Sequence, residues 1–235
     1  MKIKKILAAW RGEPQCDKCQ VRHLALFSDL AESDFVGLHL HIQELEFPAG
    51  SVVYHISEPG GAVFTVRHGD VKLLQYLPDG TQRTVRLLRQ GAALGLEAVL
   101  DKPYRHTAIT MQNTLLCRIP TSAIQQLNIQ SPKLYSQIIQ RWEQSVEQAD
   151  EWLTLLSTGT ARTRVARLFL HLIDNTNDTT CQLFGREDVA AILGITSETA
   201  CRIVAEFSRD KIINALSNNR FECDLLSLKK IAANQ

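Results

Sequence analysis

Residues 186–203 read REDVAAILGITSETACRI, and this stretch decides the fold of the C-terminal part of the chain. Small Ala190 lets two helices approach closely, and Gly194 can adopt the positive φ that ends the first of them. Thr196 or Ser197 can cap the second helix by accepting hydrogen bonds from its first backbone N–H groups. The apolar positions that would share a core across the turn are Val189, Leu193, Ala200 and Ile203. The stretch therefore predicts a helix-turn-helix.

The second of these helices is predicted to expose one polar face. Ser197, Glu198, Cys201 and Arg202 lie at positions i, i+1, i+4 and i+5, so they share one side of the helix. In a helix-turn-helix this side enters the major groove of DNA. Arg202 can donate two hydrogen bonds to guanine, and Glu198 can accept one from a cytosine amine, so we expect both to read bases. The set of predicted DNA contacts also includes Thr196 and Thr199.

The chain after the second helix predicts a β-hairpin. Residues 211–213 and 220–223 flank the polar stretch 217–219, which contains two Asn residues suited to a left-handed turn. A wing of this kind would bring Lys211 and Arg220 to DNA phosphates, which fixes register without reading sequence. An ordinary helical hairpin with an exposed Glu–Arg pair is the weaker interpretation, because it leaves the glycine and capping positions unexplained.

From about Leu45 to Ile119, short apolar runs alternate with Gly- and Pro-containing turns about every ten residues. This spacing is typical of an antiparallel β sandwich or barrel. The predicted strands include residues 63–66, 71–76, 84–88 and 115–119. We therefore expect an N-terminal β domain.

Between Pro132 and Gly159 the chain contains neither Gly nor Pro, and it predicts one long helix. Apolar residues recur there at steps of three and four, which predicts a narrow seam of the coiled-coil kind. The residues expected to contact a second copy of the chain are Ile138, Trp142, Val146, Ala149, Leu153 and Leu156. No charge lies in this seam, so we expect the dimer to persist without a cofactor. Packing of the seam against the chain's own β domain is the alternative.

Composition limits the class of protein without identifying it. The chain has 235 residues, 45% hydrophobic and 22% charged, with a formal net charge of +1. That charge gives no bulk attraction to nucleic acid, so a DNA interface must rest on locally gathered cations. No apolar run is long enough for a membrane span, and the N-terminus does not resemble a signal peptide. We expect a cytoplasmic protein whose six cysteines do not form a disulfide framework.

A β domain, a long helix and a winged helix-turn-helix, in this order, resemble the CRP/FNR family of bacterial regulators over nearly the whole chain. Residues 198–202, Glu-Thr-Ala-Cys-Arg, resemble the family's recognition-helix signature of Glu, two residues, Ser and Arg. The resemblance implies that Glu198 and Arg202 read the GA part of a half-site, while Cys201 in place of Ser leaves the outer base open. It also implies a homodimer on a pseudo-palindromic operator in double-stranded DNA, with RNA polymerase as a further partner.

The fold implied by the resemblance is α+β. It combines an antiparallel β-roll like a cyclic-nucleotide-binding domain, a long dimerisation helix and a C-terminal winged helix-turn-helix. The expected segments are a Cys-containing N-terminus (1–24), the β-roll sensor (25–131), the dimerisation helix (132–158) and the DNA-binding domain (159–235).

The expected signal is redox, gas or small-molecule, received by the β-roll. Members that bind cyclic AMP hold it with a Gly-Glu-Leu segment and an Arg-Ser pair. This chain has Gly95-Leu96-Glu97 and Tyr104-Arg105-His106-Thr107 in that neighbourhood. Glu97 is displaced by one residue and the Arg-Ser pair is absent, so cyclic AMP is not expected.

The N-terminus resembles the FNR branch, which holds an iron–sulfur cluster with four cysteines. Cys16, Cys19 and Cys117 match three of these positions, whereas Ala25 occupies the remaining one and His23 is the nearest substitute. Three alternatives stay open, namely an iron–sulfur cluster, a zinc site and no metal.

The chain's seven histidines also allow a second class of function, a cupin-like metal-dependent enzyme with a helical appendage. The histidines are scattered among turns, and this interpretation leaves the capped helix pair unexplained. We therefore expect a regulator and no enzymatic activity.

Overall fold

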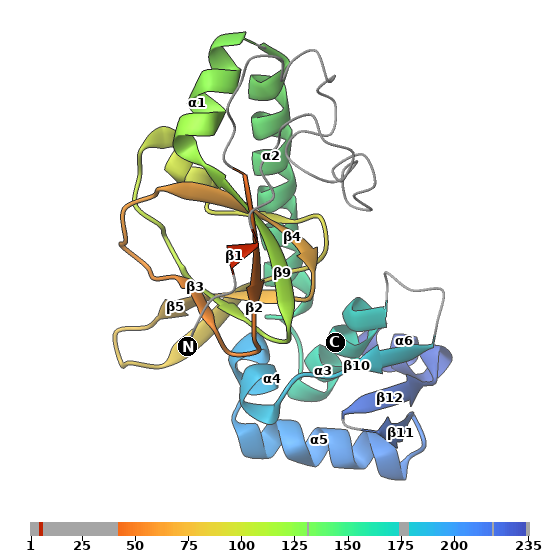
Figure 1. The fold of residues 1–235 in the computed structure, drawn as a ribbon. Helices are drawn as coiled ribbons and strands as arrows, with labels where there is room; N and C mark the ends of the chain where they lie inside the picture. Colours follow the sequence, from red (N-terminus) through yellow and green to blue (C-terminus); the bar gives the residue numbers. More distant parts are fainter. Residues whose placement is uncertain (1–4, 7–41, 131, 174–178, 218, 234–235) are drawn as a thin grey trace. The chain divides into compact units, whose positions relative to one another are not determined.

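The computed structural model describes residues 5–6, 42–130, 132–173, 179–217 and 219–233 (Figure 1). The chain divides into two compact units. The first contains residues 1–75 and 86–147, and the second contains residues 76–85 and 148–235.

Two antiparallel sheets form the first unit, as the spacing of turns predicts, although residues 76–85 of one hairpin are grouped with the second unit. One has the strand order β1-β2-β9-β4-β7 and the other β3-β8-β5-β6. Their bounds are β1 Lys5–Ile6, β2 Gln43–Phe47, β3 Val52–Tyr54, β4 Ala62–His68, β5 Val71–Tyr76, β6 Gln82–Leu88, β7 Ala93–Leu94, β8 Thr107–Thr110 and β9 Thr114–Pro120. The four strand segments predicted from the sequence fall inside β4, β5, β6 and β9.

Helical elements cover one face of the first sheet. A 3₁₀ helix, η3 (Leu96–Leu100), follows β7, and α1 (Thr121–Gln130) follows β9. Val63 and Ile119 are paired across β4 and β9, and both pack in one buried cluster with Ile124 of α1 and Leu134 of the next helix. Alternation along the strands places these apolar side chains on the helix-covered face.

The long helix α2 (Pro132–Leu155) ends close to the predicted position, and the chain turns at Gly159, whose φ is 85°. Arg167 stabilises this turn because its guanidinium donates to the carbonyl oxygens of Leu155 and Thr158, each at 3.2 Å. These bonds satisfy carbonyls that a helix end leaves without an intrahelical partner.

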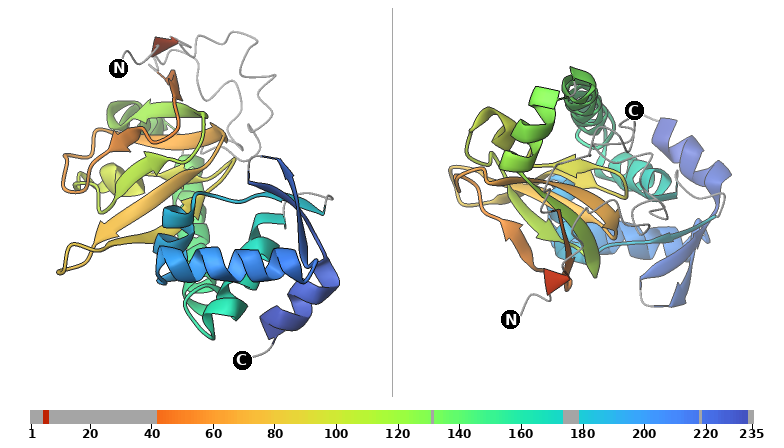
Figure 2. Two further views of the ribbon diagram at one scale, coloured as in Figure 1. Left: turned by 90° about the horizontal axis from the view of Figure 1, so that it is seen from below. Right: turned by 45° about the horizontal axis from the view of Figure 1, so that its top comes forward.

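The second unit is a winged helix-turn-helix (Figures 1 and 2). Its elements are α3 Ala161–Ile173, β10 Thr180–Gln182, α4 Arg186–Leu193, α5 Ser197–Arg209, β11 Ile213–Ser217, β12 Arg220–Cys223 and α6 Leu225–Ala233. Three phenylalanines join them: Phe169 of α3 contacts Phe207 of α5 at 6.3 Å and Phe221 of β12 at 5.9 Å between ring centroids. Strand β10 pairs with β12 and was not predicted.

Candidate nucleic-acid interface

The turn between α4 and α5 has the geometry that the sequence predicts. Gly194 ends α4 in the left-handed conformation, with φ 61° and ψ 46°. Thr196 is the residue that caps α5, and its hydroxyl accepts from the backbone N–H of Thr199 at 3.2 Å. Arg164 of α3 donates to the carbonyl oxygen of Leu193, which satisfies a group exposed by the end of α4.

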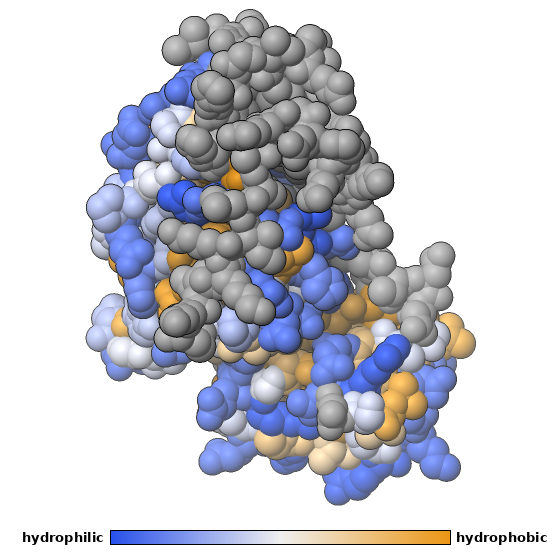
Figure 3. All heavy atoms as spheres, in the orientation of Figure 1, coloured by the Kyte–Doolittle hydropathy of each residue, from blue (hydrophilic) through white to orange (hydrophobic). Residues whose placement is uncertain are grey.

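The polar face predicted for the second helix is open to solvent in α5. Ser197, Glu198, Cys201 and Arg202 are all exposed. The predicted core positions Val189, Leu193, Ala200 and Ile203 are buried. Hydrophilic side chains dominate the lower edge of the second unit in Figure 3, where Figure 1 places α5. The helix therefore presents charged and polar groups on one side while its other side anchors it.

The exposed face extends beyond the residues predicted from the sequence. Arg209 lies seven residues after Arg202, which is two helical turns further along the same side, and it is exposed as well. The seven-residue spacing from Arg202 could have identified Arg209 from the sequence. A second cation, Arg162 of α3, braces the helix from behind by donating to Glu206 at 2.8 Å and lying 5.3 Å from the ring centroid of Phe207.

The hydroxyls of two predicted DNA contacts have local partners. Thr196 also donates to the hydroxyl of Thr199 at 3.0 Å, so both side chains take part in the cap of α5. Their contact with DNA stays a prediction.

The wing begins two residues later than predicted. Lys211 follows Asp210, the C-cap residue of α5; it has a positive φ of 57°, and its N–H donates to the carbonyl oxygen of Ser208. The first wing strand therefore starts at Ile213 because Lys211 belongs to the helix terminus. Arg220 opens the second wing strand, where its guanidinium donates to the hydroxyl of Thr180 on β10 at 3.2 Å. Both cations are exposed.

The predicted seam on α2 needs a correction. Ile138 and Leu156 are buried within the chain, and Ile138 packs with Val63 and Ile124 in the core of the first unit. They are therefore not available to a second copy. Trp142 and Ala149 are half-buried, whereas Val146 and Leu153 are exposed.

A different set of residues completes the seam. Tyr135, Ile139, Val146 and Leu153 each expose half or more of their surface. With Trp142 and Ala149 they form steps of four, three, four, three and four residues, which is the heptad spacing of a coiled coil. The seam thus starts at Tyr135 and Ile139, one residue after the positions suggested by the apolar pattern alone.

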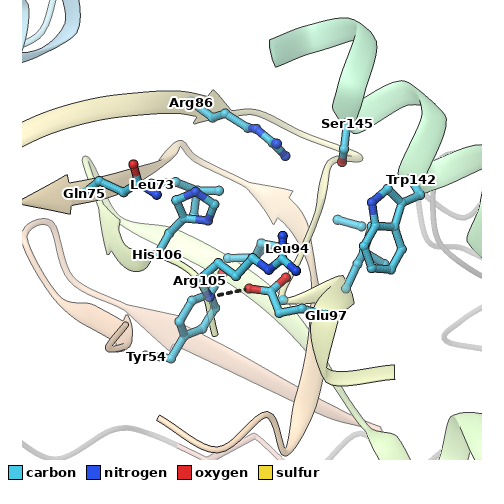
Figure 4. Close-up of a pocket in the computed structure, with 13 residues that line it drawn as sticks. Tyr54, Leu73, Gln75, Arg86, Leu94, Glu97, Arg105, His106, Trp142 and Ser145 are labelled. Carbon is cyan, nitrogen blue, oxygen red and sulfur yellow. Dashed lines mark hydrogen bonds between the residues drawn. The ribbon is translucent and has the colours of Figure 1, made fainter. Parts of the chain in front are cut away.

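The first unit contains a partly open cavity of about 300 Å³ between β-strands and α2. Arg86, Arg105, Glu97 and His106 bring charged or polar groups to it, and Trp142 lines it from α2 (Figure 4). Burial and, to a smaller extent, the charge of Arg86 lower the pKa of His106. Burial likewise lowers the pKa of Arg86 and raises that of Tyr54, another lining residue.

Of the four predicted metal ligands, Cys117 lies within the described residues. Cys117 is a half-buried residue of β9, flanked across the sheet by Glu44 of β2 and Thr65 of β4. Cys16, Cys19 and His23 lie outside the described residues. Within the described ranges, no three His, Cys, Asp or Glu side chains gather as metal ligands would. The described helices also include none that is both long and apolar enough to cross a membrane.

Two family models match the chain, a cyclic nucleotide-binding domain over residues 44–130 and a Crp-like helix-turn-helix domain over residues 163–231. The transcriptional activator protein Anr of Pseudomonas aeruginosa is 24% identical over 96% of both chains. The transcriptional activator FnrL of Cereibacter sphaeroides is 26% identical over 88% of this chain and 86% of its own. The chain belongs to the CRP/FNR family of transcription regulators.

A solved relative shows the same fold. The structure of FixK2 from Bradyrhizobium japonicum superposes with a TM-score of 0.74 at 20% identity, covering 83% of this chain and 98% of its own. The match to the Crp-like helix-turn-helix domain and the relatives named as transcriptional activators show that this CRP/FNR member is a DNA-binding transcription regulator, and the alternative of a metal-dependent enzyme is wrong.

Proposed function

We propose that this CRP/FNR regulator binds a two-fold-symmetric operator as a homodimer and reads its bases with Glu198 and Arg202, under control of a signal received by the β-roll. The main support for base reading by Glu198 and Arg202 is that both lie on the solvent-exposed face of α5. Its opposite side is fixed by buried Ala200 and Ile203, so the exposed side chains have a defined place from which to meet base edges.

The seam on α2 supports the dimer. In a single chain, α2 exposes the apolar side chains of Tyr135, Ile139, Val146 and Leu153 to water. The same stripe on a second copy would cover them. Closed two-fold pairing is the commonest way for identical chains to associate. It would place two copies of α5 in successive major grooves, with half-site centres about one helical turn apart.

Three exposed cations would hold the dimer on the DNA backbone. Arg209 is the last residue of α5, Lys211 follows two residues later, and Arg220 is the first residue of β12. Phosphate contacts from such residues position a protein without carrying sequence information. RNA polymerase is the further partner that we expect for the bound dimer.

A selection from randomised duplex DNA with the full-length protein tests this function. We expect it to recover an inverted repeat that binds two chains. Arg202→Ala should weaken binding to that repeat by about 1–3 kcal/mol per half-site, because two hydrogen bonds to a base are lost. Lys229→Ala removes an exposed positive charge from α6 and serves as the matched control, with nearly unchanged affinity. An Arg202→Ala protein with wild-type affinity and base preference would contradict the assignment.

The iron–sulfur hypothesis stays a prediction. Four ligands are required for the cluster that the FNR resemblance implies, and Ala25 supplies none. Iron and zinc analysis of anaerobically purified protein, together with its absorption spectrum near about 400 nm, distinguishes a cluster, a zinc site and a metal-free protein.

A further inference from the structure

The cavity of the first unit has an excess of positive charge. Arg86 reaches it from β6 and Arg105 from the loop before β8, whereas Glu97 is the one carboxylate among the lining residues. Two guanidinium groups and one carboxylate leave a formal excess of one positive charge when His106 is neutral. The described part of the chain offers the Arg86 guanidinium no hydrogen bond or salt bridge, although this side chain is half-buried.

Burial lowers the pKa of Arg86, and the nearby carboxylate of Glu97 offsets this effect only in part. An anion in the cavity would offset more of the cost of burying the guanidinium. In Figure 4 the guanidinium of Arg86 extends toward α2, where Ser145 and Trp142 point into the same space. The geometry therefore brings a cation and hydrogen-bonding groups to one end of a confined site.

One part of the cavity wall is apolar. The indole of Trp142 forms one side, and Tyr54 forms another, held by stacking on Tyr104 with ring centroids 3.8 Å apart. Leu73 and Leu94 contribute apolar surface between them. A cavity of about 300 Å³ is at the small end of the range of about 300–1,000 Å³ for ligand sites. Its volume and these apolar and aromatic lining residues suit a compact aromatic molecule.

The groups nearest to those that hold a cyclic nucleotide in this family have other roles in this chain. Glu97 accepts the backbone N–H of Arg105 at 2.8 Å, which fixes the loop before β8. Thr107 is buried, and its hydroxyl accepts the backbone N–H of Ile56 at 3.1 Å. The residue before Thr107 is His106, and burial lowers the pKa of its imidazole, which disfavours the charged form. The lining therefore does not fit a ribose and a cyclic phosphate.

We propose that this cavity binds a small aromatic monocarboxylate, with the carboxylate at Arg86 and the ring against Trp142. The inference rests on the proposed function in one respect, since it names the signal that the β-roll receives. Trp142 also belongs to the heptad seam of α2, and Val146 is its next member. A ligand held between β6 and α2 would thus contact the helix through which two chains associate.

The test uses 2-naphthoate as probe and its neutral amide, 2-naphthamide, as the matched compound. Full-length protein labelled with 5-fluorotryptophan gives signals from three tryptophans, and Trp142→Phe identifies the one from Trp142. We expect 2-naphthoate to shift that signal saturably in the millimolar range or below. The amide should bind at least about tenfold more weakly, which corresponds to about 1.4 kcal/mol.

Two charge variants locate the carboxylate. Arg86→Gln should weaken 2-naphthoate binding by at least about tenfold. Lys102→Gln removes an exposed cation that does not line the cavity and should leave binding unchanged. A circular dichroism melt of each variant verifies folding, and Gln75→Ala, at another lining position, gives a second charge-neutral comparison.

Equal binding of the acid and the amide, wild-type binding by folded Arg86→Gln, or absence of a shift at Trp142 would each overturn the proposal. Tighter binding of cyclic AMP than of 2-naphthoate would also overturn it. The DNA selection is measured on the same protein both without ligand and with 2-naphthoate, and it fails only if neither condition yields a bound sequence. Failure of that selection with intact 2-naphthoate binding would refute the operator-reading function alone.

Discussion

The face of α5 and the cavity of the β-roll are built in different ways. The residues that we expect to read DNA all come from one helix of 13 residues, and each is exposed by the same local periodicity. The cavity is lined by residues from Tyr54 to Ser145, contributed by strands, a 3₁₀ helix, a loop and α2. The first site depends on one helix being anchored, whereas the second depends on several segments being packed together.

This contrast explains why the sequence predicts candidate DNA-reading residues more readily than the residues that line the cavity. Exposure along a helix follows from spacing, so the order of residues along the chain is enough to identify Glu198 and Arg202. The meeting of Arg86 with Trp142 requires β6 and α2 to be adjacent, and no spacing in the sequence encodes that. A site formed by one helix can be predicted from local sequence spacing, whereas a cavity lined by several segments cannot.

The largest effect should come from Phe169→Ala in the second unit. Phe169 is fully buried between Phe207 and Phe221, and truncation of a buried Phe costs about 3–5 kcal/mol. We expect loss of operator binding, because α5 loses its anchor, while the cavity keeps its affinity for 2-naphthoate. Chemical unfolding followed separately by DNA binding and by the Trp142 signal measures both.

Phe184→Ala makes the same truncation at a half-buried position and should destabilise the second unit less. Loss of 2-naphthoate binding in Phe169→Ala would contradict the independence of the two sites, because it would show that the cavity depends on the winged helix-turn-helix for its stability.

Much of the fold could be predicted from the sequence, and the failures have physical reasons. Gly194, the cap at Thr196 and the buried faces of α4 and α5 follow from local rules and are confirmed. Strand β10 was missed because Thr180-Cys181-Gln182 is too short to show a pattern, and it forms only through pairing with β12. Local propensity cannot report such a partner.

The seam on α2 shows the same limit within one helix. Leu134 and Ile138 fit the apolar spacing as well as Tyr135 and Ile139 do, since the two pairs are adjacent in sequence. The β-roll buries the first pair against Val63 and Ile124 and leaves the second pair exposed. Which of two neighbouring apolar stripes meets a partner is therefore decided by tertiary packing.

An intermediate effect is expected from Val146→Glu in that seam. Two-fold pairing would bring the two introduced carboxylates close together in an apolar interface, where like charges oppose association. We expect the dimer dissociation constant to rise by at least about tenfold, or about 1.4 kcal/mol, in sedimentation of the protein without ligand or metal.

Gln148→Glu adds the same charge two residues later, off the heptad positions, and should leave the dimer intact. Wild-type protein that sediments as a monomer at micromolar concentration would refute the dimer itself, and with it the role assigned to the seam.

The smallest effect concerns the electrostatics of the cavity. The pKa of His106 is lowered from its ordinary value of 6.5, first by burial and then by the charges of Arg86 and Arg105, while Glu97 acts in the opposite direction. The unfolded chain therefore takes up a proton on this residue at a higher pH than the folded chain does. The resulting contribution to stability is complete above pH 6.5 and is lost as the pH falls through the lowered pKa.

His106→Gln should reduce the loss of β-roll stability between about pH 7.5 and about pH 5, measured by urea unfolding. His55→Gln makes the same exchange at an exposed position of the same unit and is the control. Arg86→Gln should also reduce this loss of stability, because it removes a cation that opposes protonation of His106. If neither variant changes the slope, the cavity does not hold His106 neutral, and its excess charge would favour a dianion over a monocarboxylate.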